Sequence, residues 1–330
     1  MTETVYLFLG ILLILGIFLD ILFTTYSMEG GGKMTDVVLS NVWKLILWIA
    51  RYQGTKKMLN HAGMFMMFGL ILLWGLGLWV GFFLILASDP NSILSSGTGT
   101  AASLGEKFYF SGYILSTMGL GDYEPNNAVW GTVSSLFSFL GIVFITLIVS
   151  YVLPVLSKIV EKKQFSLYIN HMGSTPQDLL LYFWNGKDFS EISQFGDQLR
   201  QQVLLISQSH KAYPVLHYFH TSRQNESLTI SLCLIDEALD ILINRVARDQ
   251  WEDKEIRPLR LAFDVYLNTM RDTYRYKKRM FKPMERDISK LTAANVRLSK
   301  GKEQDAERKA LWKEVLRSKG WSWDDVYTAR

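Results

Sequence analysis

Three apolar stretches are each long enough to cross a lipid bilayer, and they restrict the possible fold more than any other feature. They cover approximately residues 5–26, 64–87 and 129–155. Since a helix needs about 20 apolar residues to span the hydrocarbon layer, the sequence predicts three transmembrane helices. The first four residues include Glu3 and no lysine or arginine, which does not fit a secretory signal peptide. We therefore expect the first stretch to remain in the protein as a membrane span.

Charge separates the two halves of the chain. Residues 1–155 contain 6 Lys or Arg and 8 Asp or Glu, whereas the whole chain contains 35 and 31. The second half therefore has the composition of a soluble domain. The net charge of +4 is too small to indicate nucleic acid, and no recognised nucleic-acid motif is present. The single cysteine, Cys233, excludes an internal disulfide and fits a reducing cytoplasm.

The segment between the second and third spans has the layout of a channel pore. A polar, Gly- and Ser-rich stretch (89–105) is followed by a short apolar stretch (108–115). The short stretch cannot cross the bilayer, but it has the length of a re-entrant helix. Such a helix is tolerated at membrane depth only where protein surrounds its polar ends. The sequence therefore predicts a pore helix that enters and leaves on the same side.

The residues that follow this short helix read Ser-Thr-Met-Gly-Leu-Gly-Asp-Tyr (116–123). Glycines at alternate positions allow backbone conformations that side chains forbid. Such a run can turn successive carbonyls toward one axis, where they replace the water around a potassium ion. The predicted ion-binding residues are Thr117, Met118, Gly119, Leu120 and Gly121, with K⁺ held at the first four.

This run resembles the selectivity filter of potassium channels. With Leu120 at its fifth place and Asp-Tyr-x-Pro after it, it is most similar to the second pore loop of two-pore-domain potassium channels. The resemblance covers about residues 64–155, within a prokaryotic-type channel carrying an extra N-terminal span. It implies passive K⁺ conduction, no enzymatic activity, and no cofactor besides the permeant ion. A non-selective monovalent cation channel is the alternative within this class.

Two residues depart from the commonest filter. Met118 replaces the usual valine, and Leu120 replaces the usual tyrosine. Leucine cannot donate the phenolic hydrogen bond that ties a tyrosine to the pore helix. We therefore predict a filter that is less firmly braced and more prone to gate or inactivate.

The filter motif occurs once, and one loop cannot enclose an ion. Four identical chains are therefore expected to assemble as a homotetramer. Asp122 and Glu124 would then form rings at the outer mouth that concentrate cations. For Glu124, a solvated loop charge is an equal alternative.

The third span contains two candidate gating hinges. Gly141 lies 20 residues after Gly121, where potassium-channel inner helices often carry a hinge glycine. Pro154 resembles the proline at the inner-helix ends of some voltage-gated channels, although it equally fits a simple helix end. No span carries arginine at every third position, so a voltage sensor is not expected.

The N-terminal region contains two ambiguous features. Residues 37–52 are apolar but interrupted by Lys44 and bordered by Trp and Tyr, so we interpret them as a helix at the inner surface that contacts membrane lipids. A fourth span is the alternative. Asp20 lies inside the first span, and we expect it to make a structural bond to Thr24 or to a nearby lysine.

Basic residues in the short loops predict the orientation. Five lie between the first and second spans, and three follow the third directly. By the positive-inside rule both segments are cytoplasmic. The protein is therefore predicted to be a multi-pass protein of the inner or plasma membrane, with its N-terminus outside, its filter opening outward and its C-terminal domain in the cytoplasm.

The predicted fold is an all-α membrane protein of three regions. Residues 1–63 hold the first span and the interfacial helix, 64–155 the pore unit, and 156–330 a cytosolic helical domain. In the last region, Ser174 or Thr175 caps a helix that Pro176 begins. Further helices are predicted over 226–248, 256–279 and 303–318.

The helical domain carries no signature of a known regulator. There is no G-x-G-x-x-G motif after a strand, and His210, His217 and His220 lack the spacing and cysteine partners of a zinc site. The sequence identifies no gating ligand.

There are two alternative functions for the whole chain. One is a membrane-anchored sensor with a vestigial pore, and the other is a subunit of a K⁺ uptake transporter.

Overall fold

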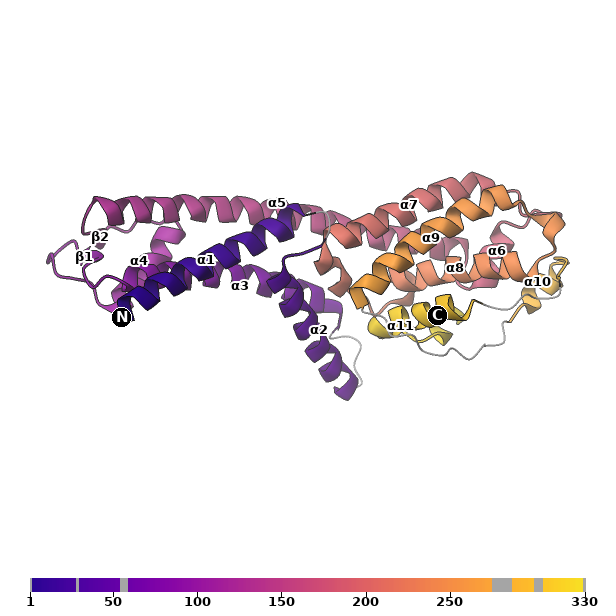
Figure 1. Cartoon of the computed structure of the whole chain (residues 1–330). Coiled ribbons are helices and arrows are strands. Elements are labelled where there is room, and N and C mark those ends of the chain that lie inside the picture. Colours follow the sequence, from indigo (N-terminus) through magenta and orange to yellow (C-terminus); the bar gives the residue numbers. More distant parts are fainter. Residues whose placement is uncertain (1, 28–29, 54–58, 275–286, 300–304, 329–330) are drawn as a thin grey trace. The chain divides into compact units, whose positions relative to one another are not determined.

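The computed structural model describes residues 2–27, 30–53, 59–274, 287–299 and 305–328 (Figure 1). The chain forms two compact units. The first contains Met1–Val42 and Met64–Leu156, and the second contains Trp43–Gly63 and Ser157–Arg330. The first span and the pore helices lie in the first unit, whereas residues 43–63 lie in the second.

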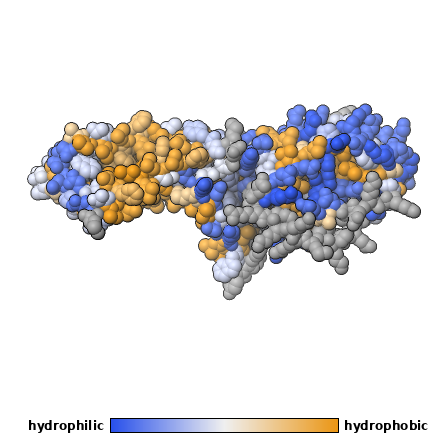
Figure 2. Space-filling model, in the orientation of Figure 1, coloured by the Kyte–Doolittle hydropathy of each residue, from blue (hydrophilic) through white to orange (hydrophobic). Residues whose placement is uncertain are grey.

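Among the described residues, three helices are long and apolar enough to cross a membrane, as predicted: α1 (Thr2–Tyr26), α3 (Leu59–Ala87) and α5 (Ala128–Met172). Their outer surfaces are apolar, whereas the visible surface of the C-terminal unit is mostly hydrophilic (Figure 2). α2 (Lys33–Gln53) is not among these helices.

The third span is longer than its apolar part. α5 continues through Pro154 to Met172, so the interpretation of Pro154 as a helix end is wrong. Proline removes one hydrogen bond from the helix. The neighbouring Tyr151 and Val155 are fully buried, and this packing offsets the loss. One helix therefore links the pore unit covalently to the C-terminal unit.

Asp20 joins α1 to the start of α2. One carboxylate oxygen accepts hydrogen bonds from the backbone N–H groups of Met34 (3.0 Å) and Thr35 (3.2 Å). The other accepts from the Thr35 hydroxyl (2.5 Å) and the Trp74 indole (3.1 Å). A carboxylate at this position satisfies the open N–H groups of the α2 N-terminus. The predicted structural role is confirmed, but the direct partners are Thr35 and Trp74 rather than Thr24 or a lysine.

A two-stranded antiparallel sheet lies at one end of the pore unit. β1 (Ile93–Ser95) pairs antiparallel with β2 (Tyr123–Pro125), with Ser95 opposite Tyr123. The re-entrant helix α4 (Leu104–Leu115) lies between the two strands in sequence. In the hydrophobic cluster that contains Ile93 of β1, Phe82 of α3 stacks on Phe137 of α5 with ring centroids 3.9 Å apart. β2 begins directly after Asp122, so the strand pair holds the C-terminal end of the predicted filter.

The C-terminal unit is a helical bundle, as predicted. Its helices are α6 (Pro176–Tyr182), α7 (Ile192–Ala212), α8 (Leu228–Arg245), α9 (Asp253–Tyr274), α10 (Ser289–Ala293) and α11 (Ala306–Ser318), with 3-10 turns Pro214–Tyr218, Gln224–Glu226, Arg248–Gln250 and Asp324–Val326. The Thr175 hydroxyl accepts from the Asp178 N–H and caps α6, with Pro176 in the first turn. Parts of two predicted helices (275–279 and 303–304) lie outside the described residues.

α8 is the central helix, and it is buried on every side from Leu228 to Leu242. The sequence predicts only one buried face. The other faces carry Asp236, Glu237 and Asp240, which meet Arg260 of α9 and Arg308 and Lys309 of α11 in a buried ionic cluster. Buried charges require such partners because an unpaired charge in the interior is costly.

Candidate ion pore

The N-terminus of α4 is anchored by a capping box. The Ser103 hydroxyl accepts from the Glu106 N–H (3.4 Å), and the Glu106 carboxylate accepts from the Ser103 N–H (2.6 Å). This arrangement satisfies open N–H groups of the first turn. The Tyr123 hydroxyl donates to the second oxygen of Glu106 at 2.8 Å. The start of α4 is therefore tied to the strand that follows the filter.

Side chains of α3 and α4 position the short helix along its length. Lys107 donates to the Leu86 carbonyl in the last turn of α3 (3.3 Å) and to the carbonyls of Asp89 (2.5 Å) and Pro90 (3.0 Å), which follow that helix. Trp79 donates to the Phe108 carbonyl at 2.9 Å and stacks on the Phe108 ring. The carbonyls at the end of α3 thus have a cationic partner, which favours that helix end.

Gly141 of α5 lies directly against the C-terminal end of α4. A Cβ atom at this position would lie 1.9 Å from the Leu115 carbonyl oxygen and 2.9 Å from its carbonyl carbon. Only glycine permits this approach of two backbones. The structure therefore assigns Gly141 a packing role, which is distinct from the predicted hinge.

α4 ends in a Schellman motif that leads into the filter. The Met118 N–H donates to the Tyr113 carbonyl, and the Thr117 N–H donates to the Ile114 carbonyl, both at 2.9 Å. This motif requires a left-handed residue after the helix, commonly glycine. Thr117 occupies that place with φ of 60°, and a β-branched residue there costs about 1–3 kcal/mol. Strain is thus held at the inner end of the filter.

Left-handed backbone recurs at every second residue of the filter. The φ angles are 60° at Thr117, 58° at Gly119 and 83° at Gly121, whereas Met118 and Leu120 are not in this region. Because left-handed residues alternate with residues of ordinary conformation, every second peptide unit is flipped relative to its orientation in an ordinary strand. Successive carbonyls can then face one side, whereas those of an ordinary strand alternate. This is the geometry that an ion-coordinating ribbon needs.

The filter is exposed in the single chain. All of residues 116–122 are exposed, including Met118 at 64% and Leu120 at 46%. A Cβ atom built on Gly119 or Gly121 meets no atom within 4 Å. The site residues from Thr117 to Asp122 are therefore brought together on one ribbon with open space around it.

The outer end of the filter is braced by residues that the sequence analysis missed. Ser96 donates through its hydroxyl to the Gly121 carbonyl (2.8 Å) and through its N–H to the Asp122 carbonyl (3.0 Å). Tyr109 donates to the Asp122 carboxylate (3.3 Å), and Tyr113 donates to the Tyr123 carbonyl (3.1 Å). The available signal was two tyrosines four residues apart on the pore helix, which share one face.

The remaining predicted residues lie outside this braced ribbon. Glu124 is exposed in β2, opposite Leu94. Pro154 lies within α5, 13 residues beyond Gly141. Among the described residues, no group of three or more His, Cys, Asp or Glu could hold a metal ion.

Comparison with known proteins identifies the family to which the chain belongs. Residues 69–158 match the family model described as an ion channel. The chain is 30% identical over 294 residues to the uncharacterized membrane protein YdjJ of Bacillus subtilis, covering 88% of this chain and 85% of YdjJ. No solved structure matches the chain. The chain therefore belongs to the same family of membrane proteins as YdjJ and contains an ion channel domain at residues 69–158.

Proposed function

We propose that the chain forms a K⁺-selective channel by fourfold assembly around residues 117–121. The ion channel domain supports conduction of ions. The filter sequence, with glycines at 119 and 121 and an aspartate at 122, supports potassium as the ion. The pore conducts passively and has no enzymatic step.

The observation that carries this proposal is the left-handed backbone at Thr117, Gly119 and Gly121. Carbonyls that face one side form a row of oxygen ligands, and four such rows around an axis replace the hydration shell of an alkali ion. The Gly121 carbonyl is already engaged by Ser96. Coordination is therefore assigned to the carbonyls of residues 117–120.

Fourfold assembly also accounts for the exposed apolar side chains of Met118 and Leu120. They point from a ribbon whose carbonyl side faces the ion, so neighbouring chains cover them in the tetramer. Asp122 then lies at the outer mouth of each chain, where carboxylates concentrate cations.

The same proposal includes an orientation. Basic residues in the segments after α1 and after the apolar part of α5 favour the cytoplasmic side. The N-terminus and the filter entrance are then outside, and the C-terminal unit is in the cytoplasm. The exposed side chains of α2 include Val37, Leu45 and Trp48, which suits contact with the membrane surface.

The test is ion flux through the purified full-length chain in liposomes. We expect K⁺-driven flux that Ba²⁺ blocks and that Gly119→Asp abolishes, because the substitution puts a side chain on a left-handed residue at the ion path. The matched control is Gly97→Asp, which lies in an exposed turn with open space around it and should conduct normally.

Reversal potentials with K⁺ on one side and Na⁺ on the other then test selectivity. Equal permeability would replace the proposal by a non-selective cation channel. Absence of flux from protein that assembles normally would favour a membrane-anchored sensor with a vestigial pore.

A further inference from the structure

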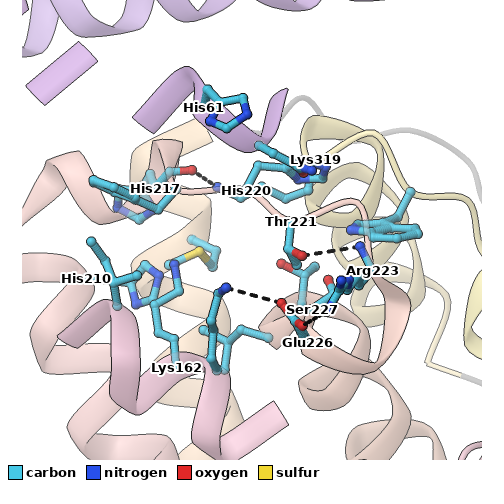
Figure 3. A pocket seen from close by; sticks show the side chains of 18 of the residues that line it. His61, Lys162, His210, His217, His220, Thr221, Arg223, Glu226, Ser227 and Lys319 are labelled. Carbon is cyan, nitrogen blue, oxygen red and sulfur yellow. Dashed lines mark hydrogen bonds and ion pairs between the residues drawn. The ribbon is translucent and has the colours of Figure 1, made fainter. Parts of the chain in front are cut away.

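The C-terminal unit contains a cavity of about 500 Å³ that the pore does not use (Figure 3). It is lined by α5, the end of α7, the connection between α7 and α8, the first turn of α8, α9, the segment after α11 and the first residues of α3. All these residues belong to the second compact unit. A cavity of this size is large enough for a small organic molecule.

The lining is strongly basic. It contains four cationic side chains, from Lys162, Lys163, Arg223 and Lys319. Among the described residues that line it, Glu226 is the one carboxylate. Figure 3 shows the labelled side chains around a central space, with His210 and Lys162 on one side and Arg223 and Glu226 on the other.

The single carboxylate is already engaged. Glu226 binds Lys163 at 3.2 Å and Arg223 at 3.0 Å. On the opposite side, Lys162 donates to the backbone carbonyl of Leu216 at 2.9 Å, and Lys319 donates to the backbone carbonyl of His217. Backbone carbonyls carry no net charge, so these two hydrogen bonds do not neutralise the lysines, which in their charged forms give this side of the cavity a positive potential. An anion is the ligand that such a potential favours.

We propose that this cavity binds a phosphate ester of small-molecule size. The phosphate would lie between Lys162 and Lys319, since both ammonium groups can donate charge-assisted hydrogen bonds to its oxygens. The cavity is larger than an inorganic phosphate needs, and Phe219, Tyr266 and Trp321 supply apolar lining for an organic group.

The first turn of α8 adds to the same potential. Ser227, Leu228 and Thr229 line the cavity, and the N-cap Ser227 makes no side-chain capping bond. The N-terminus of an 18-residue helix carries a partial positive charge. This supports an anion in the cavity, although the cationic side chains carry the assignment.

Protonation of Lys319 should be linked to binding. Burial lowers the pKa of Lys319 to about 7. Burial, together with the charge of Lys319, also lowers the pKa of Lys162 to about 7. The neighbouring charged and titratable groups of the cavity are His61, Lys162, Lys163, His210, His217, His220, Arg223 and Glu226. Burial also lowers the pKa of His210 and of His217 well below the usual range, so both rings are neutral near pH 7. A bound phosphate favours the charged ammonium, and affinity should fall as pH rises through about 7.

The test is calorimetric titration of the full-length protein in detergent with three probes: ATP, glucose 6-phosphate and inorganic pyrophosphate. Vesicles containing phosphatidic acid, compared with pure phosphatidylcholine vesicles, test whether the phosphate belongs to a lipid headgroup. We expect saturable binding of at least one soluble ester. Saturation by phosphatidic acid alone would assign the same site to a lipid phosphate. If none of the probes binds saturably, the proposal is overturned.

Two variants locate the binding. Lys162→Gln and Lys319→Gln remove a charge and keep an N–H donor for the backbone carbonyl. Each should weaken binding about tenfold, because a hydrogen bond to a charged group is lost. Lys187→Gln, on an exposed loop outside the cavity, should bind as the wild type does. Unchanged affinity in either folded cavity variant would contradict the assignment.

Lys162 lies on α5, so a ligand in the cavity would contact the same helix that forms the last span and could alter conduction. This consequence rests on the proposed channel function, whereas binding does not. Binding without flux would retain the cavity assignment and remove the channel. Flux without binding would retain the channel and remove the cavity assignment, so the two proposals can fail separately.

Discussion

At the scale of single residues, hydroxyl groups from the pore helix brace the filter of this chain. Tyr113 is buried and donates to the Tyr123 carbonyl. Tyr109 and Ser96 hold the neighbouring Asp122 and Gly121. The position usually occupied by a tyrosine is Leu120, whereas the bracing contacts here fall on residues 121–123, at the end of the predicted filter and just after it.

Tyr113→Phe should make the open filter less stable. The substitution keeps the ring and removes one hydrogen bond, which is worth about 0.5–1.5 kcal/mol. The ratio of open to inactivated channel should therefore fall by about two- to tenfold, as measured by single-channel recording in bilayers. Leu120→Tyr, which adds a phenolic group inside the filter, is expected to lengthen openings.

The matched control is Tyr168→Phe, since Tyr168 is exposed on α5 within the second unit. It should leave open times unchanged. Equal open times in Tyr113→Phe and the wild type would show that the Tyr123 contact does not brace the filter.

At the scale of elements, the decisive contact is the crossing of α5 over the end of α4. Gly141 brings the two backbones together where the filter begins. This contact places the pore helix and its Schellman turn against the inner helix. A displacement of α4 here moves Thr117, so filter geometry depends on a residue 24 positions away in sequence.

Gly141→Ala should abolish conduction and lower the thermal stability of the assembled protein. Alanine favours an α-helix over glycine by about 0.8–1.0 kcal/mol, but its Cβ would overlap the Leu115 carbonyl. The overlap should exceed the helical gain. Liposome flux and the melting temperature in detergent provide the measurement.

Gly131→Ala is the control on the same helix, because a Cβ there meets no atom within 4 Å. It should conduct and melt like the wild type or slightly above it. If Gly141→Ala keeps its stability and changes only the gating kinetics, Gly141 acts as the predicted hinge and not as a packing residue.

At the scale of the whole molecule, the C-terminal unit depends on charges buried in its core. Asp236 receives hydrogen bonds from Arg260 (2.8 Å), Arg308 (2.5 Å) and the Trp312 indole (2.6 Å). These contacts join α8, α9 and α11. Burial alone would raise the pKa of Asp236, but the Arg308 hydrogen bonds and the charges of Arg260 and Arg308 hold this pKa below its usual value.

Asp236→Asn should destabilise the C-terminal unit by about 1–3 kcal/mol, because it weakens hydrogen bonds to two buried guanidinium groups. Arg260 then keeps Asp240 as a carboxylate partner, and Arg308 keeps Asp264. Denaturant unfolding followed by tryptophan fluorescence measures this loss. Asp249→Asn is the control, since its ion pair with Arg297 is more than half exposed and should contribute less than about 1 kcal/mol.

The pH dependence of the same measurement has a definite sign. A carboxylate whose pKa is lower in the folded state stabilises the fold above its unfolded pKa, and this contribution is lost as pH falls through the folded pKa. Wild-type stability should therefore decrease below about pH 4. The decrease should be smaller in Asp236→Asn. Equal pH profiles would exclude Asp236 as a source of acid sensitivity.

The sequence predicted the features whose cause is local. Apolar length predicts the three spans, and the Thr175-Pro176 pair predicts the start of α6. Long-range partners were not predictable. The Asp20 carboxylate was expected to bind Thr24 or a lysine, because proximity in sequence gave no sign that Trp74 lies beside it. A helix end was one of the two interpretations of Pro154, because helix propensity takes no account of the packing around the residue, whereas α5 continues through it.

The sequence by itself determined that this chain has apolar helices of membrane-spanning length and a run with glycines at alternate positions, since both follow from residue type and spacing along the chain. Only the tertiary structure decided that Gly141 lies against Leu115, that Tyr113 reaches Tyr123, and that Lys162 and Lys319 share a cavity. These pairs are separated by between 10 and 157 residues. Their contacts depend on how packed helices cross, which no local pattern encodes.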